Sequence, residues 1–189
     1  MNEETTRIIQ YNSFIKKYCT NMFSVLAAYS NNDNNFGKWL VDNGFFTAPA
    51  STKYHGAYAG GLFDHSFKVT QRLVWMTEKL GLRWDFPDSP IIVGMFHDLC
   101  KIDRYEQDPT DETKYTYKTG LLYDGHGMRS AVLLAGHIRL SEEEVACIVY
   151  HMGAYEKDMW EGYDTAIRKF PNVLYTHTAD MIASKIDGV

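Results

Sequence analysis

Cysteine is scarce in this chain, and the few cysteines follow no recognisable pattern. The 189 residues include three of them, Cys19, Cys100 and Cys147. An odd number of thiols without C-x-x-C spacing argues against a disulfide framework, and no thiolate set is present for a structural zinc site. We therefore expect reduced thiols in a cytoplasmic protein, with Cys100 as a core residue that faces away from Asp98.

Long apolar runs and an excess of positive charge are also missing. No stretch approaches about 18 uninterrupted apolar residues, so we expect no membrane span and no membrane partner. Residues 1–6 carry two glutamates and no apolar core, so no secretion signal is visible. The formal net charge of −5 argues against a general nucleic-acid coat, which would need a basic surface.

Apolar residues make up 45% of the chain and recur mostly at helical spacing, which predicts an all-α single domain. A chain of this length buries roughly 70% of the surface that its unfolded form exposes, so its fold needs no disulfides or structural metal ions. Helices are expected over residues 5–29, 36–44, 62–80, 90–102 and 141–151, with two more opening at Gly125-His126-Gly127 and at Pro171. Ser141 and Glu144 have the spacing of a capping box.

The segments between these helices carry weaker signals. Residues 114–119 alternate with period two, which predicts one arm of a small β-hairpin within the charged segment 103–124. Such an excursion would form a lid, a substrate wall or a solvated loop. Residues 153–162 are expected to be a surface loop with an aromatic rim, and residues 184–189 are expected to be frayed.

The strongest chemical signal is the pair His97-Asp98 at the end of an apolar pattern. An all-apolar helix is buried, and an unpaired carboxylate in such a place is costly. Imidazole and carboxylate both bind divalent metals, although a lone pair of this kind is more often a capped helix end. Lys101 lies on a similar helical face, where it would meet either a phosphate near the metal or only solvent at the negative end of the helix dipole.

Four further stretches place a histidine or an aspartate on an apolar or small-residue pattern. They contain His65, His126, His151 and the pair His177 and Asp180. A lone histidine in such a position is more often a hydrogen-bonded core residue, but five ordered stretches favour convergence on one site. Asp180 needs a partner, which a shared metal would provide, and His177 is a candidate for orienting a ligand.

The order of these residues resembles the H…HD…D signature of the HD superfamily of metal-dependent phosphohydrolases. Residues 60–65, G-G-L-F-D-H, are similar to the G-G-L-x-x-H start of that family, and residues 97–101, H-D-L-C-K, to its H-D-[IL]-G-K core. The nearest resemblance is to the HD domain of bacterial 3'-5' exoribonucleases. These domains carry a histidine upstream of the Gly-Leu pair, and His55 has that position in this chain. The chain departs from the family at Cys100, where glycine is usual, and at Met152, where a second histidine is frequent.

The resemblance covers residues 54–186 and implies both a domain division and a site. Residues 1–50 would be an N-terminal helical extension packed on the core, and residues 51–189 the HD phosphohydrolase domain, a helical bundle. The implied metal ligands are His65, His97, Asp98, His126, His151 and Asp180; the implied catalytic residues are Asp98 and Lys101; and the implied substrate-binding residues are His55 and Lys101.

Such ligands suit one or two divalent ions. Imidazole with carboxylate fits Mn, Fe, Co, Ni or Zn, and Mg where carboxylates and water dominate. With two ions, Asp98 would bridge them, and a hydroxide generated between them would attack a phosphate ester. Lys101 would stabilise the charge that develops on the phosphoryl oxygens.

The expected function is therefore hydrolysis of a phosphate ester of a nucleotide or a short oligonucleotide, with short RNA as one candidate substrate. A small-molecule phosphomonoesterase of the same fold is a second hypothesis. A third is a non-catalytic regulatory HD domain that binds a nucleotide or a metal, and a fourth is a helical protein with scattered core histidines. No protein partner is evident from the sequence.

Overall fold

The computed structural model describes residues 1–18, 36–120, 125–155 and 159–189. Its α-helices are α1 (Glu3–Tyr18), α3 (Phe36–Asp42), α4 (Gly61–Leu80), α5 (Ser89–Phe96), α6 (His126–Ala135), α7 (Glu142–Val149), α8 (Trp160–Lys169) and α9 (Asn172–Ile182). Short helical turns are η1 (Leu99–Ile102), η2 (Gly153–Tyr155) and η4 (Ala183–Asp187), and the strands are β1 (Tyr105–Asp108) and β2 (Asp111–Tyr117). The mostly helical class with one small antiparallel hairpin is confirmed.

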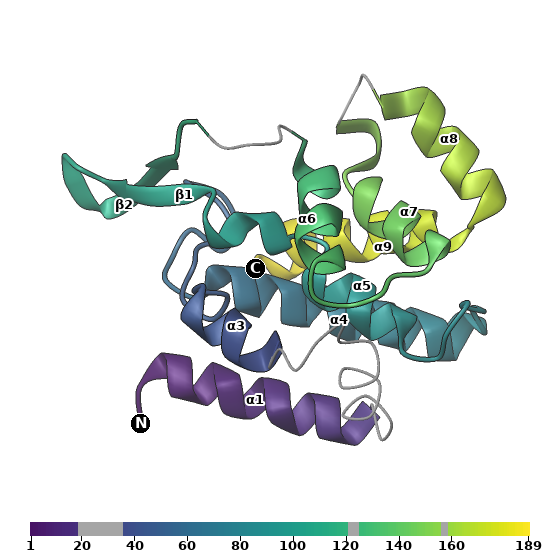
Figure 1. Ribbon diagram of the computed structural model, residues 1–189, viewed down its shortest axis with the longest axis horizontal. Coiled ribbons are helices and arrows are strands. Elements are labelled where there is room, and N and C mark those ends of the chain that lie inside the picture. Colours follow the sequence, from purple (N-terminus) through teal and green to yellow (C-terminus); the bar gives the residue numbers. More distant parts are fainter. Residues whose placement is uncertain (19–35, 121–124, 156–158) are drawn as a thin grey trace.

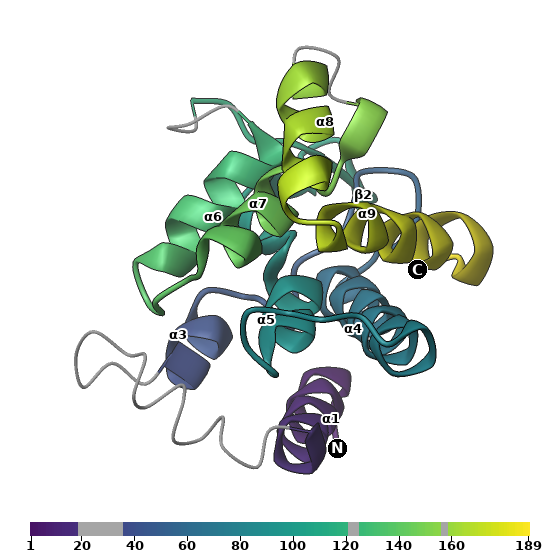
Figure 2. The same cartoon turned by 90° about the vertical axis from the view of Figure 1, so that its right-hand side faces the viewer.

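Helices α4 and α5 form the middle layer of the molecule. Helix α1 lies on one side of them, and α6, α7 and α9 lie on the other (Figures 1 and 2). Every residue of α5 is buried, as its all-apolar sequence predicts. Gly94 permits the close contact of α5 with α4, because a Cβ there would stand 2.6 Å from the Cα of Thr70. The middle layer thereby holds the residue pair His97-Asp98 at the centre of the fold.

The predicted continuous helix over residues 90–102 is wrong. Helix α5 ends at Phe96, and Asp98 has φ −103° and ψ 16°, outside the helical region. The chain then continues as the 3₁₀ turn η1, in which the Lys101 amide donates to the Asp98 carbonyl at 2.9 Å. In a 3₁₀ turn, side chains three residues apart eclipse one another, so the break places the Lys101 side chain directly beside that of Asp98.

In the second half of the chain, the structure agrees with only some of the predictions made from the sequence. The capping box of α7 is confirmed, since Ser141 Oγ accepts from the Glu144 amide and the Glu144 carboxylate accepts from the Ser141 amide. The predicted surface loop 153–162 is wrong at its end, because α8 starts at Trp160; residues 156–158 lie outside the described part. Helix α8 buries Tyr163 and Ala166, and the partly buried Ile167 packs against the same core, so its sequence does carry apolar residues at helical spacing that the prediction overlooked.

The C-terminal residues are ordered, not frayed as expected. Residues 183–187 form a π-helical turn, and the Arg72 guanidinium binds the Asp187 carboxylate with Nε 2.8 Å from Oδ2. The main-chain carbonyl of Val189 accepts a hydrogen bond from His65 Nδ1 at 2.9 Å. These long-range contacts order a segment whose sequence alone gives no helix signal.

The N-terminal helix joins the same hydrophobic core as the rest of the described chain. Tyr11 and Ile15 are buried in that core, and the Tyr11 ring meets Phe46 edge-on with 5.8 Å between centroids. Arg7 forms a bidentate ion pair with Asp64 in the first turn of α4, at 3.1 and 3.2 Å. The predicted helix 5–29 is seen as far as Tyr18; its remainder and Cys19 lie outside the described residues. The division of the chain at residue 50 stays a prediction.

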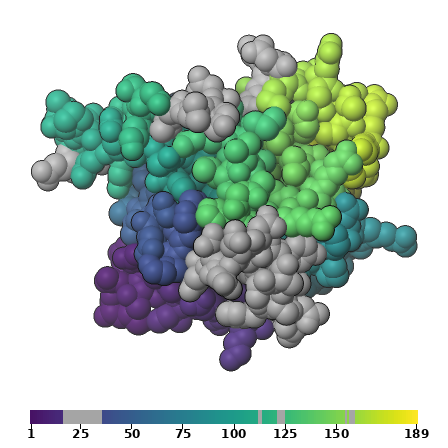
Figure 3. Space-filling model, in the orientation of Figure 1, coloured from purple at the N-terminus to yellow at the C-terminus, as the bar shows by residue number. Residues whose placement is uncertain are grey.

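The β-hairpin lies in the segment where the sequence predicts it and projects beyond the helical body (Figures 1 and 3). Its strands pair in antiparallel register from Tyr105 opposite Tyr117 to Asp108 opposite Asp111. The Lys118 amide donates to the Arg104 carbonyl at 2.9 Å and extends the ladder toward the helices. The hairpin ladder therefore begins at Arg104, two residues after the end of η1 and three residues after Lys101.

None of the helices in the described part of the chain is both long and apolar enough to cross a membrane.

We predict that Arg7→Met lowers the free energy of unfolding by about 1–2 kcal/mol, because it removes two charge-assisted hydrogen bonds from a largely buried guanidinium. The matched control is Arg168→Met, which removes an exposed pair with Asp164 on α8 and should cost about 0.5 kcal/mol or less. Denaturant titration of both variants measures this. Equal losses would show that α1 is not tied to α4 through Arg7.

Candidate metal centre

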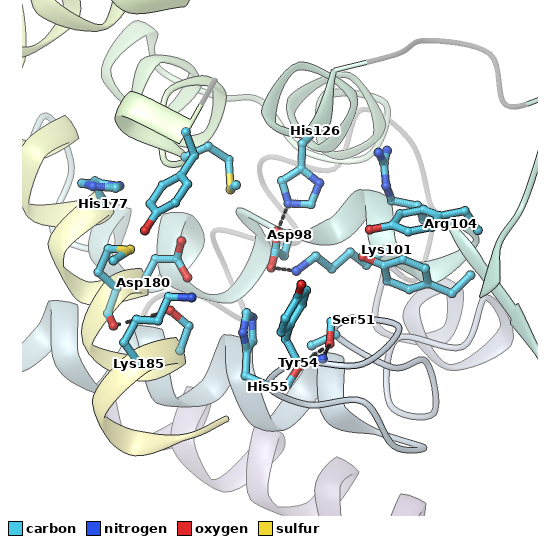
Figure 4. A pocket seen from close by; sticks show the side chains of 17 residues that line it. Ser51, Tyr54, His55, Asp98, Lys101, Arg104, His126, His177, Asp180 and Lys185 are labelled. Carbon is cyan, nitrogen blue, oxygen red and sulfur yellow. Dashed lines mark hydrogen bonds and ion pairs between the residues drawn. The ribbon is translucent and has the colours of Figure 1, made fainter. Parts of the chain in front are cut away.

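The six residues predicted as metal ligands converge on one point between α4, α5, α6, α7 and α9. Each belongs to at least one of three groups whose ligand atoms lie within 4.8 Å of one another and could hold a metal ion. The groups are His65, His97 and Asp98; His97, His151 and Asp180; and Asp98, His126 and His151. Figure 4 shows Asp98 in the middle, with His126 on one side of it and Asp180 on another.

The two oxygens of Asp98 face two different sets of imidazoles. Oδ2 lies 3.4 Å from His65 Nε2 and 3.5 Å from His97 Nε2. Oδ1 lies 2.5 Å from His126 Nε2 and 3.5 Å from His151 Nε2. A carboxylate placed in this way can bridge two neighbouring ions, as was inferred from the sequence.

Asp180 stands on the His65 side of the centre. Its Oδ1 lies 3.2 Å from His65 Nε2, and it forms a metal-binding group with His97 and His151. It reaches the site from α9, two turns after the start of that helix at Asn172. Two carboxylates and four imidazoles thus share one buried volume, a combination that suits first-row transition metals.

Main-chain carbonyls fix the orientation of three of the imidazoles. Nδ1 of His97 donates to the Gly94 carbonyl at 2.9 Å, and Nδ1 of His151 donates to the Ile148 carbonyl at 2.6 Å. Both carbonyls lie in the last turn of a helix, where they lack partners within the helix. With Nδ1 of each ring held by these carbonyls, and Nδ1 of His65 by that of Val189, each Nε2 faces the centre and would be the atom available to a metal ion.

His126 has a different partner. Its Nδ1 lies 3.3 Å from the thiol of Cys100, which is fully buried. The expectation that Cys100 faces away from the site is therefore wrong, although its assignment to the core holds. Burial raises the pKa of the Cys100 thiol to about 11, so the group is neutral and can only act as a weak donor or acceptor.

Two buried atoms at the centre lack a hydrogen bond. Although Asp98 Oδ1 lies close to two imidazole nitrogens, neither it nor His151 Nε2 makes a hydrogen bond of acceptable geometry within the described part of the chain. Buried polar atoms are seldom left in this state, because each costs about 1–3 kcal/mol. A divalent ion between such atoms would satisfy both, so the residues present fit a metal.

The electrostatics of the centre are dominated by the two carboxylates. Burial alone would raise the pKa of Asp98, but Lys101, His97 and His126 hold that pKa well below its usual range. Burial would likewise lower the pKa of His65, but hydrogen bonds to Asp180 and Asp98 outweigh it and raise the pKa to about 9. A proton on His65 therefore supplies positive charge that a bound cation would replace.

The predicted substrate-binding residues lie beside this centre. A cavity of about 430 Å³ opens above Asp98, and both His55 and Lys101 line it. The His55 ring packs on the His65 ring with centroids 4.9 Å apart, and Ser51 Oγ holds the His55 carbonyl at 2.8 Å. Lys101 is 7% exposed, and its Nζ lies 2.6 Å from Asp98 Oδ2, which excludes its interpretation as a solvated helix end.

Sequence reasoning missed part of the cavity wall. Arg104, Tyr105 and Tyr117 line it from the base of the hairpin, and Lys185 lines it from η4. The period-two pattern of the hairpin could have indicated that Tyr117 stands opposite Tyr105, but no local pattern brings Lys185 to the site. His177 is placed as an orienting residue, because its Nδ1 donates to the His151 carbonyl at 2.7 Å.

Comparison with known protein families, with curated proteins and with solved structures found no match to this chain.

We predict that the protein binds about two Mn²⁺ ions per chain and that Asp98→Asn binds none tightly, because the shared carboxylate is lost from both ion positions. Elemental analysis after desalting measures the metal content, and thermal unfolding should show stabilisation by Mn²⁺ in the wild type only. Asp164→Asn on the exposed face of α8 is the control and should behave as the wild type. A metal-free wild type after addition of Mn²⁺ would leave the histidines as core residues.

The two sides of Asp98 should be separable. We predict that His65→Ala loses the ion on the Asp180 side and keeps the other, whereas His126→Ala does the reverse, so that each variant retains about one equivalent. Calorimetric titration with Mn²⁺ counts the sites that remain. Loss of both ions in both variants would mean that the ligands form a single coupled centre.

Proposed function

We propose that this protein is a metal-dependent phosphohydrolase of the HD type. The observation that carries the proposal is the position of Asp98, whose two carboxylate oxygens lie between two sets of imidazoles. Lys101 Nζ lies 2.6 Å from one of these oxygens, Oδ2. Four imidazoles, two carboxylates and a buried ammonium gather around one centre, and they come from the residues on which the sequence resemblance rests. That resemblance supports the assignment to the HD superfamily, and the geometry is compatible with it.

The ligands divide into two sets around Asp98. His65 and His97, with Asp180 beside His65, would complete an ion position at Oδ2, and His126 and His151 would complete one at Oδ1. The division is not complete, because His151 also forms a group with His97 and Asp180. When bound, divalent ions lower the pKa of water and withdraw charge from phosphoryl oxygens, which is the chemistry that hydrolysis of a phosphate ester requires. The carbonyls of Gly94, Ile148 and Val189 keep the ligand nitrogens aimed inward throughout.

Lys101 has the properties of a phosphate-binding group. Burial alone would lower the pKa of this lysine, but Asp98 and Tyr105 raise it to about 12, so the ammonium stays charged. Its side chain lies along the cavity floor and ends beside Asp98 (Figure 4). It can therefore hold a phosphoryl oxygen at the metal centre and stabilise the charge that develops there.

The size of the cavity favours a small substrate over a long RNA strand. Its volume of about 430 Å³ is that of a site for one small ligand. A track for single-stranded RNA combines a basic groove with stacking platforms along several nucleotides, whereas this chain has a net charge of −5. We therefore favour a nucleotide or the end of a short oligonucleotide as substrate.

We predict that Lys101→Met lowers kcat for a phosphate ester by about 10²–10³-fold while leaving the metal content unchanged. Initial rates with nucleoside monophosphates and with p-nitrophenyl phosphate in Mn²⁺ measure this, and Lys114→Met on the exposed hairpin serves as control. Phosphate release by the wild type with no loss in Lys101→Met would contradict the role of Lys101. Nucleotide binding without any turnover would favour a regulatory domain instead of an enzyme.

A further inference from the structure

The cavity above Asp98 carries more positive charge than the metal site explains. Its lining includes three permanent cations, Lys101, Arg104 and Lys185, against two carboxylates, Asp98 and Asp180, an excess of one before any metal ion binds. The whole chain, by contrast, has a net charge of −5. Positive charge is therefore concentrated in this cavity, and one or two divalent ions would add to it. A ligand with several negative charges fits such a site.

Arg104 and Lys185 are available to such a ligand. Within the described ranges, no carboxylate lies within ion-pair distance of either side chain, whereas Lys101 is paired with Asp98. Figure 4 places Arg104 and Lys185 on opposite sides of Asp98. The Arg104 guanidinium is held over the ring of Tyr117, 5.8 Å from its centroid, so its position is defined by the hairpin.

Aromatic rings surround the opening of the same cavity. Tyr54, Tyr117 and Tyr155 are 70%, 57% and 63% exposed, and they come from three separate segments of the chain. Tyr105 lies deeper and meets Tyr117 edge-on with 5.3 Å between centroids. Single exposed aromatics are ordinary, but several around one cavity provide faces on which a planar base can stack.

We propose that the ligand of this cavity is a nucleoside that carries two separate phosphate groups. One phosphate lies at Asp98 and Lys101, the base stacks on the tyrosines of the rim, and the second phosphate binds Arg104. The proposal deepens the proposed function and rests on it for the position of the first phosphate. A free nucleoside 3',5'-bisphosphate and the 5'-phosphorylated end of a short oligonucleotide share this chemistry.

The position of Arg104 in the chain supports the assignment of the second phosphate. Arg104 follows Lys101 by three residues, between η1 and β1; both line the cavity, and Figure 4 shows them on the same side of Asp98. A guanidinium binds phosphate through a fork of donors, which suits a fixed anion better than the flexible ammonium of Lys185 on the opposite wall. Lys185 then contributes to the general attraction of an anionic ligand.

The test compares the affinity of ligands with one and with two phosphates. Adenosine 5'-monophosphate, adenosine 3',5'-bisphosphate and the dinucleotide pApA are titrated by calorimetry into the protein as purified, at low salt. Each ligand is recovered afterwards to detect hydrolysis, and KM from initial rates replaces Kd for any ligand that is hydrolysed. We expect the two ligands with a second phosphate to bind about tenfold more tightly than the monophosphate.

The variants assign that difference to Arg104. In Arg104→Gln the ratio of the affinities for ligands with two phosphates and with one should fall from about ten to about one. Arg104→Lys should keep part of this preference. Lys114→Gln removes a charge from the same hairpin outside the cavity and should keep all of it. Equal affinities in the wild type, or a preference that survives in Arg104→Gln, would overturn the proposal. Binding of fructose 1,6-bisphosphate as tightly as the nucleoside bisphosphate would overturn its nucleoside part.

The same measurements separate this proposal from the proposed function. Tight binding of the bisphosphate without hydrolysis of any ligand would support the ligand class and contradict the phosphohydrolase. Hydrolysis of all three ligands without a preference among them would support the enzyme and contradict the second phosphate site. If pApA alone gains affinity, the ligand is an oligonucleotide end; if both gain it, a free nucleotide is sufficient.

Discussion

The buried carboxylate of Asp98 is the constraint on which the site depends. It is 2% exposed, and a carboxylate removed from water must be compensated by cations and hydrogen-bond donors on every side. Lys101 provides one such group, and four imidazole nitrogens surround the two oxygens at 2.5 to 3.5 Å. Because Oδ1 still lacks a well-formed hydrogen bond within the described chain, a bound cation is the natural completion of this cluster.

The backbone builds this environment at the ends of helices. Helices α5 and α7 each end one or two residues before a histidine, and each of these histidines donates to a carbonyl of the helix that precedes it. The unpaired carbonyls of a helix terminus thus aim the imidazoles inward. The hairpin and the loop around His55 then close the cavity over the centre, so that the scaffold is helical while substrate-facing residues come from the connections.

Much of this could be predicted from the sequence because the signals are local. Apolar periodicity predicted most of the helices, and the capping-box spacing of Ser141 and Glu144 predicted the start of α7. The period-two alternation of residues 114–119 predicted the hairpin. The break after Phe96 was missed because residues 97–101 continue a helical pattern, whereas α8 was missed although Tyr163, Ala166 and Ile167 recur at helical spacing. The partners of His65 and His177, and the position of Lys185, depend on contacts distant in sequence, which no local pattern encodes. The catalytic roles stay predictions.

The most direct test of the account is a crystal structure of the protein grown with Mn²⁺, with data collected on both sides of the manganese absorption edge. Anomalous difference density locates the ions independently of any assumption about activity. We predict two peaks, one on each side of the Asp98 carboxylate and each within coordination distance of histidine Nε2 atoms. No peak near Asp98, with ions bound only by exposed carboxylates elsewhere, would contradict it.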